Sequence, residues 1–133
     1  MAKVLVVEDN PANMTLATFL LKSAGHTVYC AADAETGLTL ARAEQPDLVL
    51  MDIQLPGMDG LEATALLKSD QATRAIPVIA LTALAMKGDE ERIRAAGCDG
   101  YIAKPLAYRD FLATIAAQLV RSPLNGITPG LPV

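Results

Sequence analysis

The chain has 133 residues, and 15 acidic side chains against 11 Lys and Arg give it a formal charge of −4. This length predicts one compact domain, and a hydrophobic fraction of 52% excludes the composition of a disordered chain. The acidic excess argues against nucleic-acid binding, which uses clustered Lys and Arg. No uncharged stretch exceeds 12 residues, whereas a transmembrane helix needs about 18 apolar ones, so we expect no membrane span.

Five short apolar runs alternate with segments of helical periodicity. Three of the runs are apolar almost throughout, which is typical of parallel strands covered by helices on both faces. The pattern predicts an α/β fold, (βα)5, with an open, doubly wound, five-stranded parallel sheet. The predicted strands are Val4–Val7, Thr27–Ala31, Leu48–Met51, Val78–Leu81 and Tyr101–Ala103. The predicted helices cover residues 11–24, 34–44 and 60–68, a fourth segment from about 86 or 87 to 96, and residues 108–120.

Start and stop signals delimit the helices and the domain. Asn10 stands as a cap before Pro11, and Gly25 closes that first helix. Residues 122–133 contain three prolines and no helical period. We therefore expect one domain over residues 1–121, followed by a flexible C-terminal tail over residues 122–133.

The cysteines and the N-terminus bear on the cellular compartment. Acidic residues follow the first apolar run at once, so no secretory signal is expected. Cys30 and Cys98 lack the paired spacing of a zinc site. Because free cysteine packs as a small hydrophobic side chain, we expect two buried thiols in a reducing cytoplasm.

Polar residues that can carry chemistry follow directly after the predicted strands. Because open α/β sheets bind ligands at the carboxyl ends of their strands, these side chains are expected to meet at one sheet edge. Converging carboxylates raise one another's pKa unless a cation compensates. The residues are Glu8 and Asp9 after the first strand, Asp52 after the third, Thr82 after the fourth, and Lys104 with Pro105 after the fifth.

This set of residue types favours phosphoryl transfer. Clustered carboxylates without His or Cys suit a hard ion such as Mg²⁺. Lys104 supplies a positive charge for a phosphoryl group, and Thr82 supplies a hydroxyl donor. Singly, each residue could be a helix cap or a surface residue. Together they provide a carboxylate nucleophile, a metal, a cation and a hydrogen-bond donor.

Four segments make the sequence similar to the receiver domains of bacterial two-component response regulators. They are Val6–Asn10, Leu50–Gly60, Ala80–Ala83 and Ala103–Pro105, and the resemblance extends over most of the chain. It implies the flavodoxin-like strand order 2-1-3-4-5. The stretch from Ala83 to Arg92 further resembles DivK-type single-domain receivers, and similar stretches occur in receivers of hybrid histidine kinases.

The resemblance implies a role for each residue at the sheet edge. Asp52 is expected to accept a phosphoryl group from a phosphohistidine. Asp9 and Asp52 are the expected Mg²⁺ ligands, with the backbone carbonyl of Gln54 as a third and Glu8 acting through a metal-bound water. Thr82 and Lys104 are expected to bind phosphoryl oxygens, and the bond from Lys104 to Pro105 is expected to be cis.

The resemblance also implies how the signal leaves the domain. Tyr101 stands at the switch position and is expected to turn inward when Thr82 moves toward the phosphate; as residues alone, it could be a half-buried aromatic on an edge strand. The fourth helix, fifth strand and fifth helix form the expected output face. Gln54 and Leu84 stand where family members tune dephosphorylation, and the apolar Leu84 predicts slow to moderate loss of phosphate.

The favoured function is therefore a stand-alone signalling receiver rather than an enzyme. Its expected partners are a histidine kinase or histidine phosphotransfer protein and a downstream protein target. Three alternatives remain: a flavin-binding protein, for which acidic Glu8 and Asp9 are unfavourable; a phosphate-ester hydrolase, which usually has an acid where Gln54 stands; and a degenerate receiver that serves only as a scaffold.

Overall fold

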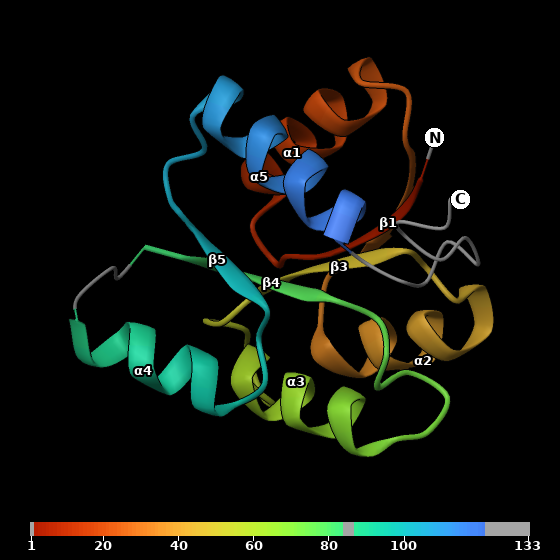
Figure 1. Ribbon diagram of the computed structural model, residues 1–133, viewed down its shortest axis with the longest axis vertical. Helices are drawn as coiled ribbons and strands as arrows, with labels where there is room; N and C mark the ends of the chain where they lie inside the picture. The colour runs from red at the N-terminus through yellow and green to blue at the C-terminus, as the bar shows by residue number, and fades with distance from the viewer. Residues whose placement is uncertain (1, 84–86, 122–133) are drawn as a thin grey trace.

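The computed structural model describes residues 2–83 and 87–121, which form a parallel sheet between two layers of helices (Figure 1). The five strands lie in the order β2-β1-β3-β4-β5, as predicted. The predicted tail, residues 122–133, and Leu84 lie outside the described residues. The elements are β1 (Lys3–Val7), α1 (Pro11–Ser23), β2 (Thr27–Ala31), α2 (Ala34–Glu44), β3 (Leu48–Asp52), α3 (Gly60–Ser69), β4 (Val78–Thr82), α4 (Lys87–Ala95), β5 (Gly100–Ala103) and α5 (Tyr108–Arg121).

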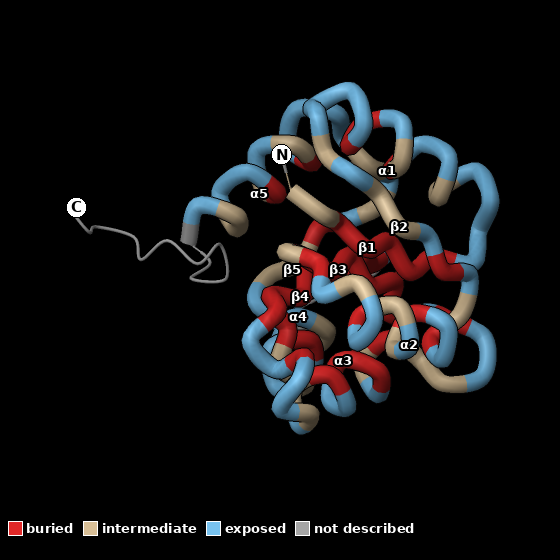
Figure 2. Tube along the Cα trace, turned by 90° about the vertical axis from the view of Figure 1, so that its right-hand side faces the viewer, coloured by how far each residue is buried: buried red, intermediate tan, exposed pale blue. Residues whose placement is uncertain are grey.

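The sheet is covered on both faces because its central strands are apolar at every position except their ends, where Lys3, Asp52 and Thr82 stand. Along β1, Val4 and Val6 pack in the core shared with α1 and α5, whereas Leu5 and Val7 pack in the core shared with α2, α3 and α4. Figure 2 shows the buried residues concentrated along these central strands. Polar side chains are therefore confined to the ends of the strands. Those that follow the carboxyl ends of the strands lie together at one edge of the sheet.

Caps at the helix N-termini fix the loops that follow the strands. The side-chain oxygen of Asn10 accepts a hydrogen bond from the Asn13 N–H at 3.0 Å, and Asn10 comes immediately after the acidic pair that follows β1. Asp59 and Glu62 form a reciprocal capping box at the start of α3. Such caps contribute about 1 kcal/mol each. They hold the β1–α1 and β3–α3 loops beside the carboxyl edge.

The expectation of two buried thiols is wrong for Cys30, which is exposed, and correct for Cys98. Cys30 lies on β2, an edge strand, where its sulfur is 3.6 Å from the Thr18 hydroxyl. Only an inner strand is covered along its whole length, and apolar periodicity alone does not tell an edge strand from an inner one. Cys98 packs beside Thr64, and burial raises the pKa of its thiol.

We predict that Phe111→Ala lowers the free energy of unfolding by about 3–5 kcal/mol, because Phe111 is fully buried where α5 packs on the sheet and its truncation leaves a cavity. The control is Phe19→Ala, since Phe19 is 66% exposed and its truncation is expected to change stability by at most about 0.5 kcal/mol. Urea unfolding followed by circular dichroism measures both. Equal losses in the two variants would contradict the core assignment.

Candidate functional site

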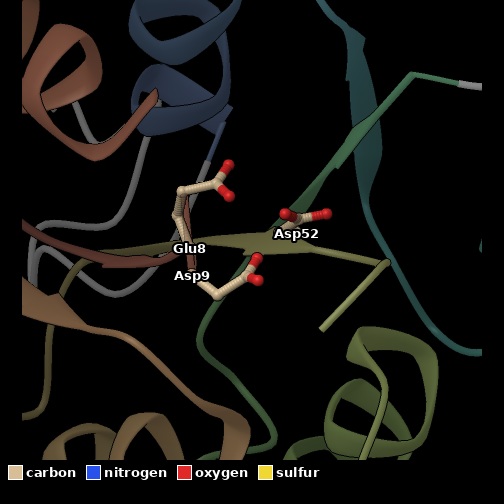
Figure 3. Close-up of side chains that lie close together, drawn as sticks. All are labelled: Glu8, Asp9 and Asp52. Atoms are coloured by element: carbon tan, nitrogen blue, oxygen red, sulfur yellow. The ribbon is translucent and has the colours of Figure 1, made fainter. Parts of the chain in front are cut away.

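Three carboxylates meet at the carboxyl edge of the sheet. Glu8 and Asp9 follow β1, and Asp52 is the last residue of the neighbouring strand β3. Figure 3 shows the three side chains gathered there, and one oxygen of each lies within 4.8 Å of the others. Glu8 and Asp52 are buried, whereas Asp9 is exposed. The sequence prediction that strand ends bring these acids together is confirmed.

Lys104 is the cation that balances the buried pair. Its Nζ lies 2.9 Å from Glu8 Oε1 and 3.0 Å from Asp52 Oδ2. Burial lowers the pKa of Lys104, but the bonds to Glu8 and Asp52 outweigh burial and leave it raised, so the ammonium keeps its charge. The backbone N–H of Lys104 donates to the Thr82 carbonyl at 2.7 Å, and the Lys104–Pro105 bond is cis, as expected.

Among the residues that the structure describes, one oxygen of Glu8 has no hydrogen-bond partner. Glu8 Oε2 accepts from the Asn10 N–H at 3.1 Å, whereas the buried Oε1 forms an ion pair with Lys104 but no hydrogen bond within the described part of the chain. Burial, and then the nearby Asp52, raise the pKa of Glu8. A buried carboxylate oxygen in this condition fits a further polar partner, such as an ion or its bound water. The all-oxygen set of Glu8, Asp9 and Asp52 is the donor chemistry that Mg²⁺ prefers.

The backbone around Asp52 fixes the direction of its carboxylate. The Gln54 N–H donates to Asp52 Oδ1 at 2.9 Å, while Lys104 binds Oδ2. The Gly60 N–H donates to the Ile53 carbonyl at 3.2 Å. A Cβ at Gly60 would overlap the Asp52 carbonyl oxygen and lie 2.7 Å from Ile53 Cα. Glycine at the start of α3 therefore lets the helix approach the strand that carries Asp52.

Thr82 lies on β4, the strand next to that of Asp52, and Tyr101 lies on β5, one strand further out. Thr82 is buried at the end of β4 and pairs with Ala103 of β5. Tyr101 is half-buried on the edge strand β5, opposite Ala80. Its hydroxyl donates to Glu90 Oε2 of α4 at 2.6 Å. This bond holds the pKa of Tyr101 above its ordinary value.

Two surface features escaped the sequence analysis. One is the contact between Glu90 and Tyr101. The sequence does not indicate it, because Glu90 stands in a run of charged residues that is typical of a solvent-exposed helix face. The other is a shallow apolar hollow of about 620 Å³ on α1, beside the acidic edge. There Leu16 is 40% exposed and Phe19 is 66% exposed. The signal that could have indicated this hollow is the presence of Leu16 and Phe19 on the side of the first helix that faces solvent, where polar residues are expected.

Residues 4–116 match the sequence model of the response regulator receiver domain. The chain belongs to this family. Its relatives include the polar-differentiation response regulators DivK of Brucella ovis and Brucella melitensis, each 51% identical over 116 residues that cover 87% of this chain and 94% of the relative. The match favours a receiver with a phosphoacceptor signalling role over the flavin-binding and ester-hydrolase alternatives.

Solved receiver structures share the fold. A putative response regulator from Chloroflexus aurantiacus has a TM-score of 0.87 at 27% identity, covering 90% of this chain and 98% of that one. The receiver domain of the sensor histidine kinase PA1611 from Pseudomonas aeruginosa has a TM-score of 0.83 at 36% identity, covering 89% of this chain and 97% of its own. The PA1611 receiver has a magnesium ion coordinated in its active-site cleft.

Within residues 2–83 and 87–121, no helix has both the length and the apolar character needed to cross a membrane.

We predict that Glu8→Gln flattens the pH dependence of stability in metal-free protein. Because the folded-state pKa of Glu8 is raised, the folded chain keeps this proton when the unfolded chain has lost it. The Glu8 contribution to the free energy of unfolding should therefore fall as pH rises through the mildly acidic range above the ordinary pKa of a glutamate. Burial lowers the pKa of His26, which contributes the opposite slope in every variant, so the comparison between variants isolates Glu8. The raised pKa of Lys104 acts only in the alkaline range, so it does not contribute there.

Urea unfolding in the presence of a chelator, at several pH values, measures this slope. The control is Glu35→Gln, in the exposed first turn of α2, which should keep the slope of the unsubstituted chain. A Glu8→Gln slope that equals the control would contradict the assignment.

Proposed function

We propose that Asp52 is the phosphoacceptor and that it takes its phosphoryl group from a phosphohistidine. The observation that carries this proposal is the fixed carboxylate: Lys104 binds one Asp52 oxygen at 3.0 Å and the Gln54 N–H binds the other at 2.9 Å. A carboxylate oxygen of Asp52 attacks phosphorus, the P–O bond forms, and the P–N bond to imidazole breaks. The leaving imidazole takes up a proton.

Lys104 and Thr82 have the chemistry to bind the transferred group. Phosphorylation replaces one negative charge on Asp52 by a group that carries about −1.5 to −2 at neutral pH. Lys104, already next to Asp52 and Glu8, offsets part of this charge. Thr82 ends the strand beside β3, where its hydroxyl can donate to a phosphoryl oxygen after a small displacement. The register of the strands determines where Lys104 and Thr82 lie relative to Asp52.

The acidic edge is the proposed Mg²⁺ site. Asp9, Asp52 and the backbone carbonyl of Gln54 would hold the ion, and Glu8 would contact it through a bound water, which fits its buried Oε1. The ion would supply positive charge for the phosphoryl oxygens. Asp9, the exposed member of the set, stands at the solvent side of the other two carboxylates.

The proposed phosphodonor is a protein, a histidine kinase or a histidine phosphotransfer protein. The apolar hollow on α1 begins at Pro11, two residues after Asp9, so it adjoins the acidic edge. An apolar surface with exposed Leu16 and Phe19 fits a helix that presents phosphohistidine to Asp52. A small-molecule donor would need no such surface.

The proposed signal leaves through α4, β5 and α5 to a downstream protein, as a non-enzymatic switch. We place the chain in the cytoplasm, since Cys30 and Cys98 are free thiols and Cys30 is exposed. Slow to moderate dephosphorylation, inferred from Gln54 and Leu84, stays a prediction because Leu84 lies outside the described residues.

We predict that phosphoramidate with Mg²⁺ adds one phosphoryl group to the chain and that Asp52→Asn abolishes the addition. Intact mass measurement detects it. Asp47→Asn is the matched control, because Asp47 precedes the same strand and binds the Lys3 N–H away from the site. An equal mass gain in Asp52→Asn, or no gain in the unsubstituted chain, would overturn the proposal.

We also predict that Mg²⁺ stabilises the chain and that Asp9→Asn removes this effect. A ligand at 100 times its Kd adds about 2.7 kcal/mol to the free energy of unfolding. Thermal unfolding with and without Mg²⁺ measures it, and Glu35→Gln should keep the full stabilisation. Because Asp9 is exposed, its substitution should leave the metal-free protein folded. Full stabilisation in Asp9→Asn would argue against its role as a ligand.

A further inference from the structure

The contact between Tyr101 and Glu90 joins the edge strand to the helix beside it. The phenol hydroxyl on β5 donates to the Glu90 carboxylate on α4 at 2.6 Å. This is a short hydrogen bond with a charged acceptor, a class about twice as strong as neutral pairs. The ring itself is half-buried against the core on the α2, α3 and α4 side of the sheet. The bond and the packing together define one position of Tyr101.

The same two segments are attached to the proposed phosphoryl-binding residues. Tyr101 lies on β5, Lys104 directly follows the end of that strand, and Lys104 binds Asp52. Thr82 ends β4, pairs with Ala103, and is followed along the chain by α4, which carries Glu90. A phosphoryl group that attracts Lys104 and Thr82 therefore acts on β5 and on the chain leading to α4. These are the two elements that the Tyr101–Glu90 bond connects.

A bond made in only one of two arrangements opposes the other arrangement. Any position in which the Tyr101 ring turns away from α4 must break its bond to Glu90. The bond stabilises the unphosphorylated arrangement by a certain factor. If the phosphorylated arrangement lacks the bond, the affinity for a phosphoryl group falls by the same factor. Glu90 thus acts on Asp52 through Tyr101, without contact to the site itself.

We propose that Glu90 is a positioning residue that holds Tyr101 in its unphosphorylated place and so sets the threshold for phosphorylation. This inference rests on the proposed role of Asp52. Its matched control is Glu91, the next residue of α4, which is exposed and makes no ion pair or side-chain hydrogen bond among the described residues. Replacing either residue removes one carboxylate from the same part of α4, and only one of them contacts Tyr101.

The test uses beryllofluoride with Mg²⁺ as a phosphoryl mimic, with its affinity measured by calorimetry. Glu90→Ala should bind beryllofluoride about three- to tenfold more tightly than the unsubstituted chain, because loss of one such bond is worth a factor of this size. Glu91→Ala should bind as the unsubstituted chain does. Glu90→Gln keeps an acceptor oxygen without the charge and should fall between the two.

A double substitution shows whether the effect passes through Tyr101. Tyr101→Phe keeps the ring but lacks the hydroxyl, so it should tighten beryllofluoride binding as Glu90→Ala does. In the Tyr101→Phe background, Glu90→Ala should add nothing. Equal affinities for Glu90→Ala and Glu91→Ala, or a Glu90→Ala effect that persists without the hydroxyl, would overturn the proposal.

A second readout needs no phosphoryl mimic. The three tyrosines can be replaced by 3-fluorotyrosine, and the fluorine signal of Tyr101 is the one missing in Tyr101→Phe. In alkaline titration, Glu90→Ala should lower the pKa of Tyr101, whereas Glu91→Ala should not. Failure of the unsubstituted chain to bind beryllofluoride would overturn the assignment of Asp52 as phosphoacceptor, and with it the proposed effect of Glu90 on phosphorylation. Equal Tyr101 titrations in the two variants would overturn the Glu90 contact alone.

Discussion

The bridge from Lys104 to Glu8 and Asp52 is the interaction on which the site depends. Two buried carboxylates at one sheet edge repel each other, and neither can reach bulk water to lower that cost. One ammonium within 3.0 Å of both makes the pair tolerable. It does so incompletely, since the pKa of Glu8 stays raised and its Oε1 has no hydrogen bond to any described residue. The remaining charge imbalance is what suits the edge to a divalent cation.

The rest of the fold serves to keep this bridge in place. Glu8, Asp52 and Lys104 come from three different strands, so their distances depend on the register of β1, β3, β4 and β5. That register is held because a slip along the sheet would draw the polar residues at the strand ends, Lys3 or Asp52, into the apolar layers between sheet and helices. Gly60 adds the close approach of α3 to the end of β3. Core packing and site geometry are therefore one constraint.

The sequence predicted those features that depend on chain periodicity and strand ends. Glu8, Asp9, Asp52, Thr82 and Lys104 could be placed together because each directly follows or ends an apolar run. Strand order came only from resemblance to a family, since periodicity does not distinguish an edge strand from an inner one; Cys30 on β2 was misplaced for that reason. The Tyr101–Glu90 bond was equally inaccessible, because it depends on how α4 is rotated and packed against β5, which follows it directly in the chain.

β5 links the acidic site to the surface of the domain. Lys104 follows the strand and binds the acidic pair, while Tyr101 lies within the strand and binds Glu90 on α4. An edge strand has a neighbouring strand on one side only, so β5 can shift at a lower cost than β1 or β3. A change of charge at Asp52 would therefore reach, through Lys104, a strand that the sheet holds on one side only. The Glu90 carboxylate is well placed to oppose that shift, because it binds β5 from the helix that follows Thr82 along the chain.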